Sequence, residues 1–177
     1  MMTFFPLIVS TALMMPSVTA VPAAGTETYP SSGDRGYAQP GTIKLVIDLN
    51  TASPGDGGAN PGLAAVESLV AEYGARRPHP PKVDIVVVLH AKTANLALGE
   101  EAARRRGAVS TADRTRMKAL SAKGVRFVVS RQSLVSQGIG ESELLSWVGR
   151  GPNSSMIFLD LEAGGYIFDT AKSLGTD

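Results

Sequence analysis

The chain has 177 residues, 44% of them hydrophobic, and its 17 basic and 16 acidic residues leave a formal net charge of +1. This suits one domain with a real core, and the near-neutral charge gives no global field to attract nucleic acid or an anionic membrane. The chain has no cysteine, which excludes disulfides, thiolate metal sites, persulfide carriers and cysteine nucleophiles, and its only imidazoles are those of His79 and His90.

The first 20 residues are typical of a signal peptide, although they contain no Lys or Arg. Their apolar run, residues 4–15, is roughly a dozen residues long, whereas a bilayer core needs about 20. Small residues precede Ala20, where a signal peptidase could cut. We expect residues 1–20 to be a signal peptide and residues 21–41 a flexible linker, in a periplasmic or secreted protein that has no membrane contact after cleavage. A retained hydrophobic anchor or a misassigned start codon is the alternative.

Residues 42–50 (TIKLVIDLN) predict the first strand, because a β-branched and apolar run ends there before a cluster of glycines. Asn60 and Pro61 then favour the start of a helix that Gly74 ends. Residues 83–90 (VDIVVVLH) predict the second strand. Its apolar residues are continuous rather than alternating, which indicates that both of its faces are covered, as in a parallel sheet between helices.

The second half of the chain repeats this alternation. Residues 93–107 favour helix without clear bounds. Ser110 and Asp113 resemble a capping box at the start of the next helix, and Gly124 suits its left-handed end. Residues 125–130 (VRFVVS) predict the third strand, and a short helix follows as far as Gly138.

The last part of the domain is less distinctive. Residues 156–159 fit a strand or a buried helix, and we expect helix, followed by a short final strand at residues 166–168. The order of elements favours an α/β domain over residues 42–177. We expect three layers, with a mainly parallel sheet, right-handed crossovers and helices on both faces.

Four segments in this order resemble the DsrE-like family of small α/β proteins associated with sulfur transfer. They are KLVIDLN at 44–50, DIVVVLHA at 84–91, KGVRFVVSRQSLVSQGI at 123–139 and LEAGGY at 161–166. The resemblance implies a flavodoxin-like fold, frequent assembly into trimers or hexamers, and an active-site cysteine that carries sulfur. Ser130 stands where that cysteine would be. Because a hydroxyl cannot form a persulfide, sulfur transfer by the cysteine route is excluded.

Four polar residues are the candidate ligand-binding residues: Asp48, Asn50, His90 and Ser130. All of them lie at the ends of predicted parallel strands, where open α/β sheets bind ligands. His90 is a candidate general base toward Ser130 or a bound water, which makes these two the candidate catalytic residues. In the alternative interpretation, His90 and Asp48 only satisfy loop amides and helix ends. No nucleophile elbow surrounds Ser130, and we expect neither a metal site nor a cofactor.

Three further features have plain structural alternatives. The glycine-rich segment 55–60 could offer amides to a phosphate, but it lacks the Walker lysine and the dinucleotide spacing, which favours a flexible connector. Arginines 104–106 follow Glu100 and Glu101 on a helix, which favours ion pairs over nucleic-acid binding. Trp147 suits either an interface or closure of the core.

The sequence therefore predicts an exported DsrE-like domain, linked to sulfur metabolism, that binds a small ligand or a protein partner without cysteine chemistry. We expect a homo-oligomer, either a dimer, a trimer or a hexamer. One alternative is a hydrolase-type enzyme that uses His90 with Ser130 or an activated water. Another is a structural subunit of a larger assembly.

Overall fold

The computed structural model describes residues 42–50, 59–76, 80–107 and 109–170, all of which belong to one compact unit, residues 37–177. The predicted signal peptide and linker lie outside the described residues. Within the described ranges, no helix is both long enough and apolar enough to span a membrane.

The described residues form a sheet of five strands, all parallel, in the spatial order β4-β3-β2-β1-β5. The strands are β1 (Ile43–Leu49), β2 (Val83–Leu89), β3 (Arg126–Ser130), β4 (Gly149–Gly151) and β5 (Ile167–Thr170). The predicted parallel α/β architecture is confirmed, and the bounds of the four expected strands differ by one or two residues.

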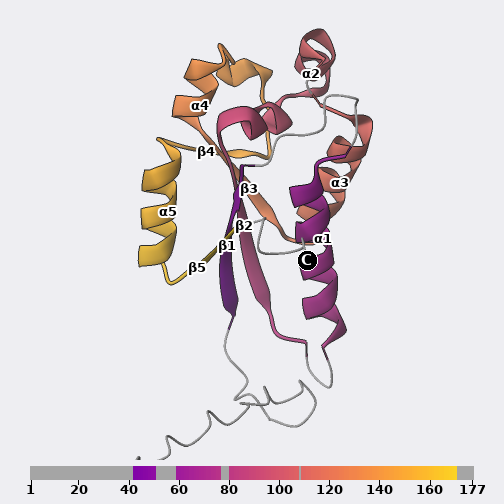
Figure 1. Cartoon of the computed structure of the whole chain (residues 1–177), viewed down its shortest axis with the longest axis vertical. Coiled ribbons are helices and arrows are strands. Elements are labelled where there is room, and N and C mark those ends of the chain that lie inside the picture. Colours follow the sequence, from indigo (N-terminus) through magenta and orange to yellow (C-terminus); the bar gives the residue numbers. More distant parts are fainter. Residues whose placement is uncertain (1–41, 51–58, 77–79, 108, 171–177) are drawn as a thin grey trace, which may run out of the picture. The chain divides into compact units, whose positions relative to one another are not determined.

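Helices cover both faces of this sheet, as expected (Figure 1). On the first face lie α1 (Pro61–Ala75) and α3 (Thr111–Ala122), and on the second lies α5 (Ser154–Ala163). The central strand β2 explains the continuous apolar run of the sequence. Val87 packs into the larger core cluster of the first face, whereas Val86 and Val88 pack with Ile157 of α5 on the second face.

Short elements lie beyond the carboxyl ends of the strands, at the top of Figure 1. They are the 3₁₀ helix η1 (Ala91–Ala97), α2 (Glu100–Arg106), α4 (Arg131–Ser136) and the 3₁₀ turn η2 (Glu141–Glu143). Residues 93–107, for which the sequence predicts helix without clear bounds, thus form the end of η1 and the helix α2. His90, which follows β2, caps η1, and Arg131, which follows β3, is the first residue of α4. Each of these two strand ends is therefore held in place by the short element that follows it.

The capping box predicted at Ser110 is formed only in part. The Ser110 hydroxyl accepts a hydrogen bond from the Asp113 amide at 3.0 Å, as expected. The Asp113 carboxylate, however, accepts a hydrogen bond from the backbone N–H of Asn60, 53 residues earlier, at 2.5 Å. Because Asn60 caps α1, this buried contact fixes the starts of the two helices on the first face against each other.

Strand β4 was missed by the sequence analysis, because Gly-Arg-Gly carries neither an apolar run nor β-branched residues. The structure explains the glycine at its end. A Cβ on Gly151 would lie 2.3 Å from Ile157 Cγ1, so only glycine lets α5 pack this closely. Trp147, just before the strand, packs edge-on against Phe127 with 5.8 Å between the ring centroids, and it is 41% exposed, which leaves both an interface and closure of the core open.

Candidate functional site

The carboxyl ends of β1 and β2 bring Asp48 and His90 into direct contact. The two strands pair in register at Leu49 and Leu89, and side chains alternate between the faces of a sheet. Asp48 and His90 therefore both lie on the second face, where His90 Nε2 is 2.5 Å from Asp48 Oδ1. Their side chains are 13% and 21% exposed, so the pair is mostly buried but reaches the surface.

Asn50 joins this pair. Its Nδ2 donates a hydrogen bond to the other carboxylate oxygen, Asp48 Oδ2, at 3.2 Å. An ionised carboxylate only accepts hydrogen bonds, so the proton between the first two residues belongs to His90 Nε2. In a neutral imidazole this leaves the lone pair on Nδ1. Asp48 thus sets the tautomer of His90, as the orienting acid does in catalytic dyads.

The backbone beyond β2 fixes the histidine. The His90 N–H donates to Thr93 Oγ1 at 3.0 Å, and this hydroxyl lies 2.5 Å from the carbonyl oxygen of Leu49. The ends of β1 and β2 are therefore tied together beneath the side-chain pair.

Ala91, the residue after His90, has a positive φ of 46°, which is unusual for a residue other than glycine. Its N–H donates to Ser133 Oγ at 2.9 Å, and its carbonyl accepts from Gln137 Nε2. Both partners follow β3, so helix α4 and the residue after it hold Ala91 in this strained conformation. Backbone strain that the surroundings enforce is concentrated at functional sites, and here it lies next to the imidazole.

Aromatic residues flank the pair on the second face. Phe158 of α5 meets the His90 ring edge-on, with 6.2 Å between the ring centroids, and in turn contacts Phe168 of β5 at 5.1 Å. The imidazole thus contacts an aromatic ring as well as the Asp48 carboxylate.

Ser130 lies at the end of the neighbouring strand but has a different role. Its hydroxyl caps α4 by accepting a hydrogen bond from the Ser133 amide at 3.3 Å, and the residue is only 1% exposed. Within the described residues, no hydrogen bond joins Ser130 to His90. The structure therefore brings Asp48, Asn50 and His90 into one cluster and leaves Ser130 as a buried helix cap.

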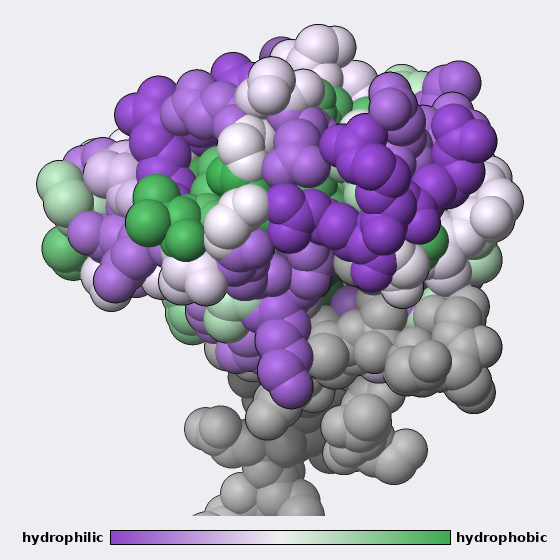
Figure 2. Space-filling model, turned by 90° about the horizontal axis from the view of Figure 1, so that it is seen from above, coloured by the Kyte–Doolittle hydropathy of each residue, from purple (hydrophilic) through white to green (hydrophobic). Residues whose placement is uncertain are grey.

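The cluster can bind a ligand or act on a proton through His90 Nδ1. No group of three or more metal-ligating side chains occurs among the described residues. Figure 2 views the molecule from the carboxyl side of the sheet, where hydrophilic surface predominates and is interrupted by a hydrophobic patch.

Sequence reasoning did not single out Ala91, Thr93, Ser133 or Phe158. Alanine does not favour a positive φ, so the residue type gives no sign of the conformation of Ala91. Thr93 and Ser133 act through contacts with other elements. The one available signal was position, since Thr93 and Ser133 are each three residues beyond the end of a predicted strand.

Two of the three arginines of α2, Arg105 and Arg106, form ion pairs, which agrees in part with the structural alternative. Arg105 pairs with Glu101 at 2.8 Å, and both Arg105 and Arg106 reach Glu143 in η2, at 3.2 and 3.0 Å. The Gly140 amide and these arginines lower the pKa of Glu143. The glycine-rich segment lies outside the described residues, apart from Ala59 and Asn60.

A second polar cluster lies near the start of the strands on the second face. The Asp84 carboxylate accepts hydrogen bonds from the Tyr166 hydroxyl at 2.6 Å and from Arg126 at 2.9 Å. Burial acts to raise the pKa of Asp84, but these two hydrogen bonds outweigh it, and the pKa lies below its usual value. The cluster joins β2, β3 and the start of β5, which is a structural role.

The fold and this site define a class of protein: an α/β domain with an all-parallel sheet and a polar cluster at the carboxyl ends of its central strands. No family model matches the chain, and no curated protein matches it. Among solved structures, it is similar to a protein of unknown function, MTH1491 from Methanobacterium thermoautotrophicum. The identity is 16% and the TM-score 0.47, over 74% of this chain and 99% of the other.

Proposed function

We propose that the protein is an exported DsrE-like domain that binds a small polar ligand at the Asp48–His90 pair and performs no cysteine-based sulfur transfer. The observation that carries this proposal is the contact at 2.5 Å between Asp48 and His90, at the edge where parallel sheets bind ligands. The positive φ of Ala91 beside His90 supports the proposal, because enforced backbone strain is concentrated at functional sites.

The nature of the ligand follows from the chemistry of His90 Nδ1, the ring nitrogen that does not contact Asp48. Its Nδ1 accepts a hydrogen bond when the imidazole is neutral and donates one when it is protonated. Hydroxyl groups suit the first state, and oxyanions suit the second. The link to sulfur metabolism rests on the resemblance to DsrE-like proteins alone, and it adds sulfite and thiosulfate to the oxyanions worth testing.

We also propose that the protein assembles with copies of itself. Two large apolar side chains support this: Leu159 of α5 is 64% exposed and Ile167 of β5 is 65% exposed. Strand β5 lies at the edge of the sheet that the described residues form. Equilibrium sedimentation of residues 42–177 would measure the assembly, and a monomer at micromolar concentration would contradict it.

A second candidate function is hydrolysis by water that His90 activates. The tautomer enforced by Asp48 favours it, because a general base needs its lone pair directed away from the orienting acid. The buried cap role of Ser130 argues against a serine nucleophile, so this enzyme would use water directly.

Histidine NMR would test the binding proposal. The chain has two histidines, so a His79→Gln variant assigns the His90 ring signals and also serves as the matched control. Titration with phosphate, sulfite, thiosulfate and small hydroxy acids should produce saturable shifts of the His90 ring. Asp48→Asn should weaken that binding about tenfold, the effect of losing one charge-assisted hydrogen bond. Ring signals that respond to none of these ligands would contradict the proposal.

Turnover would test the second candidate. A panel of ester and phosphate substrates is incubated with the wild type, with His90→Ala and with Ser130→Ala. Hydrolysis that His90→Ala abolishes and Ser130→Ala retains would support activated water. Equal rates in the wild type and His90→Ala would rule it out.

A further inference from the structure

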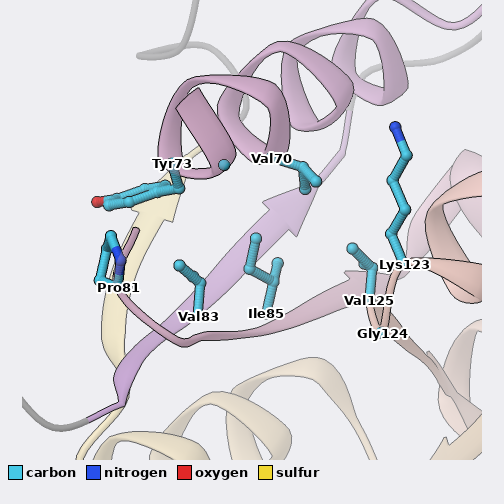
Figure 3. Close-up of a pocket in the computed structure, with 9 residues that line it drawn as sticks. Val70, Tyr73, Pro81, Val83, Ile85, Lys123, Gly124 and Val125 are labelled. Carbon is cyan, nitrogen blue, oxygen red and sulfur yellow. The ribbon is translucent and has the colours of Figure 1, made fainter. Parts of the chain in front are cut away.

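A cavity of about 180 Å³ lies at the opposite end of the sheet from the Asp48–His90 pair (Figure 3). It lies between the end of α1, the start of β2 and the turn that joins α3 to β3. The residues that line it are Val70, Tyr73, Gly74, Pro81, Val83, Ile85, Lys123, Gly124 and Val125. None of them contributes to the carboxyl-edge site.

The cavity has a mixed lining with an apolar floor. Ile85 and Val125 form its floor and are 3% and 4% exposed, and Val70 and Val83 pack against the same core. An apolar cavity of roughly 150 Å³ in another protein stays dry and accepts one benzene ring. This cavity is open to solvent, but it has the size, and over Ile85 and Val125 the apolar floor, for a single ring or a branched alkyl group.

Glycine keeps the cavity open on the side of α1. Gly74 lies in the last turn of the helix and has no positive φ, and among the described residues a Cβ added there would meet no atom within 4 Å. Nothing in the backbone demands glycine, although alanine would favour the helix by about 1 kcal/mol. A binding site that needs open space beside α1 explains why glycine occupies position 74.

Two polar side chains, Lys123 and Tyr73, also line the cavity. Figure 3 shows them on opposite sides of Val83 and Ile85, each with its polar group at the outer tip of the side chain. Within the described residues, no hydrogen bond or ion pair engages the Lys123 ammonium. The negative end of α3 lies nearby, but the amides of Lys123, Gly124 and Val125 already satisfy its last carbonyls. The full charge of Lys123 therefore outweighs the partial charge of the helix end.

We propose that this cavity binds a small carboxylic acid with one aromatic ring or a branched alkyl body. The apolar body lies over Ile85 and Val125, and the carboxylate lies at Lys123. The site is separate from the proposed function, so either can fail without the other.

Benzoate is the probe for the test, and benzyl alcohol is its neutral counterpart of similar size. Methyl NMR of the full chain should show saturable shifts at Val70, Ile85 and Val125, with a dissociation constant of about 1 mM for so small a ligand. Benzyl alcohol should bind about threefold more weakly, because an exposed ion pair adds little. Lys123→Met should remove that difference and leave benzyl alcohol unaffected.

Two variants of Gly74 test the space itself. Gly74→Leu should block the cavity and lower benzoate affinity at least tenfold, whereas Gly74→Ala, the matched control, should lower it less than threefold. Both should unfold cooperatively at or above the wild-type temperature, because each favours α1. If Gly74→Leu does not fold, Lys123→Met at an exposed position still decides the question.

Three results would overturn the proposal. They are benzoate shifts that do not saturate, shifts centred on His90 rather than on the cavity methyls, and equal affinity for benzoate and benzyl alcohol in the wild type. Binding that Gly74→Leu leaves unchanged would also place the ligand elsewhere.

Discussion

The Asp48 carboxylate and the His90 imidazole meet at 2.5 Å across the ends of two neighbouring parallel strands. Both side chains are largely withdrawn from solvent, so their interaction is screened less than a surface ion pair. Removal of one partner would leave the other partly buried and short of a hydrogen bond.

We expect this pair to contribute measurably to stability. Asp48→Ala and His90→Ala should each lower the free energy of unfolding by about 1–2 kcal/mol, and a double-mutant cycle should give a coupling energy of about 1 kcal/mol. Urea denaturation at pH 7 measures all three. Asn50→Ala is the control, because its contact is exposed and should cost less than about 0.5 kcal/mol. A coupling energy near zero would show that the contact is incidental.

The positive φ of Ala91 makes a second prediction. Ala91→Gly should stabilise the protein by about 1 kcal/mol, because glycine adopts a φ of 46° without a steric penalty. Ala94→Gly, in the same 3₁₀ helix, should destabilise it, since Ala94 is buried and has no positive φ. Thermal unfolding of the two variants should shift in opposite directions. If the unfolding temperature of both variants decreases, the conformation of Ala91 carries no steric penalty that glycine could relieve.

A third prediction concerns Ser130, which the resemblance to DsrE-like proteins places at the position of their cysteine. Ser130→Ala should cost about 1 kcal/mol, the usual price of losing an N-cap, and should leave ligand binding at His90 unchanged. Ser142→Ala, at an exposed serine, is the matched control and should be close to neutral. Loss of binding in Ser130→Ala at full stability would mean that the hydroxyl contacts the ligand after all.

The fold was predictable because its signals are local. The continuous apolar run at residues 83–90 predicts a strand covered on both faces, which the structure confirms. Residues 156–159 fit a strand or a helix by their local pattern, and the expected helix is confirmed. Strand β4 was not predictable, since its short glycine-rich segment pairs only because β3 and α5 are already in place.

The candidate site was predictable in outline only. Parallel strands deliver their last residues to one edge, so the proximity of Asp48 and His90 followed from the strand assignments. Their pairing, and the different role of Ser130, depend on side-chain rotamers and on contacts from α4 that no local pattern encodes.

Asp113 is another residue whose contact no local pattern encodes, and it leads to a fourth prediction. Its buried carboxylate accepts a hydrogen bond from the Asn60 amide, which the capping-box pattern did not indicate. Asp113→Ala should lower the free energy of unfolding by about 2–3 kcal/mol, because a buried N–H at the start of α1 loses this acceptor. Thr111→Ala, on the exposed side of the same helix turn, should be nearly neutral. Urea denaturation measures both, and a cost below that of a surface substitution would contradict the role of Asp113.

The last prediction concerns acid. Hydrogen bonds from Tyr166 and Arg126 lower the pKa of Asp84 in the folded protein. A carboxyl group whose folded pKa is depressed stabilises the fold above its unfolded pKa of about 4. That contribution is lost as the pH falls through about 4 and then through the lower folded value. The urea midpoint should therefore decrease between pH 5 and pH 3, and it should decrease less in Asp84→Asn, which holds no titrating proton. Glu100→Gln, at an exposed position, is the matched control and should behave like the wild type. If the urea midpoint of Asp84→Asn decreases with falling pH as steeply as that of the wild type, the Asp84 cluster makes no contribution to acid sensitivity.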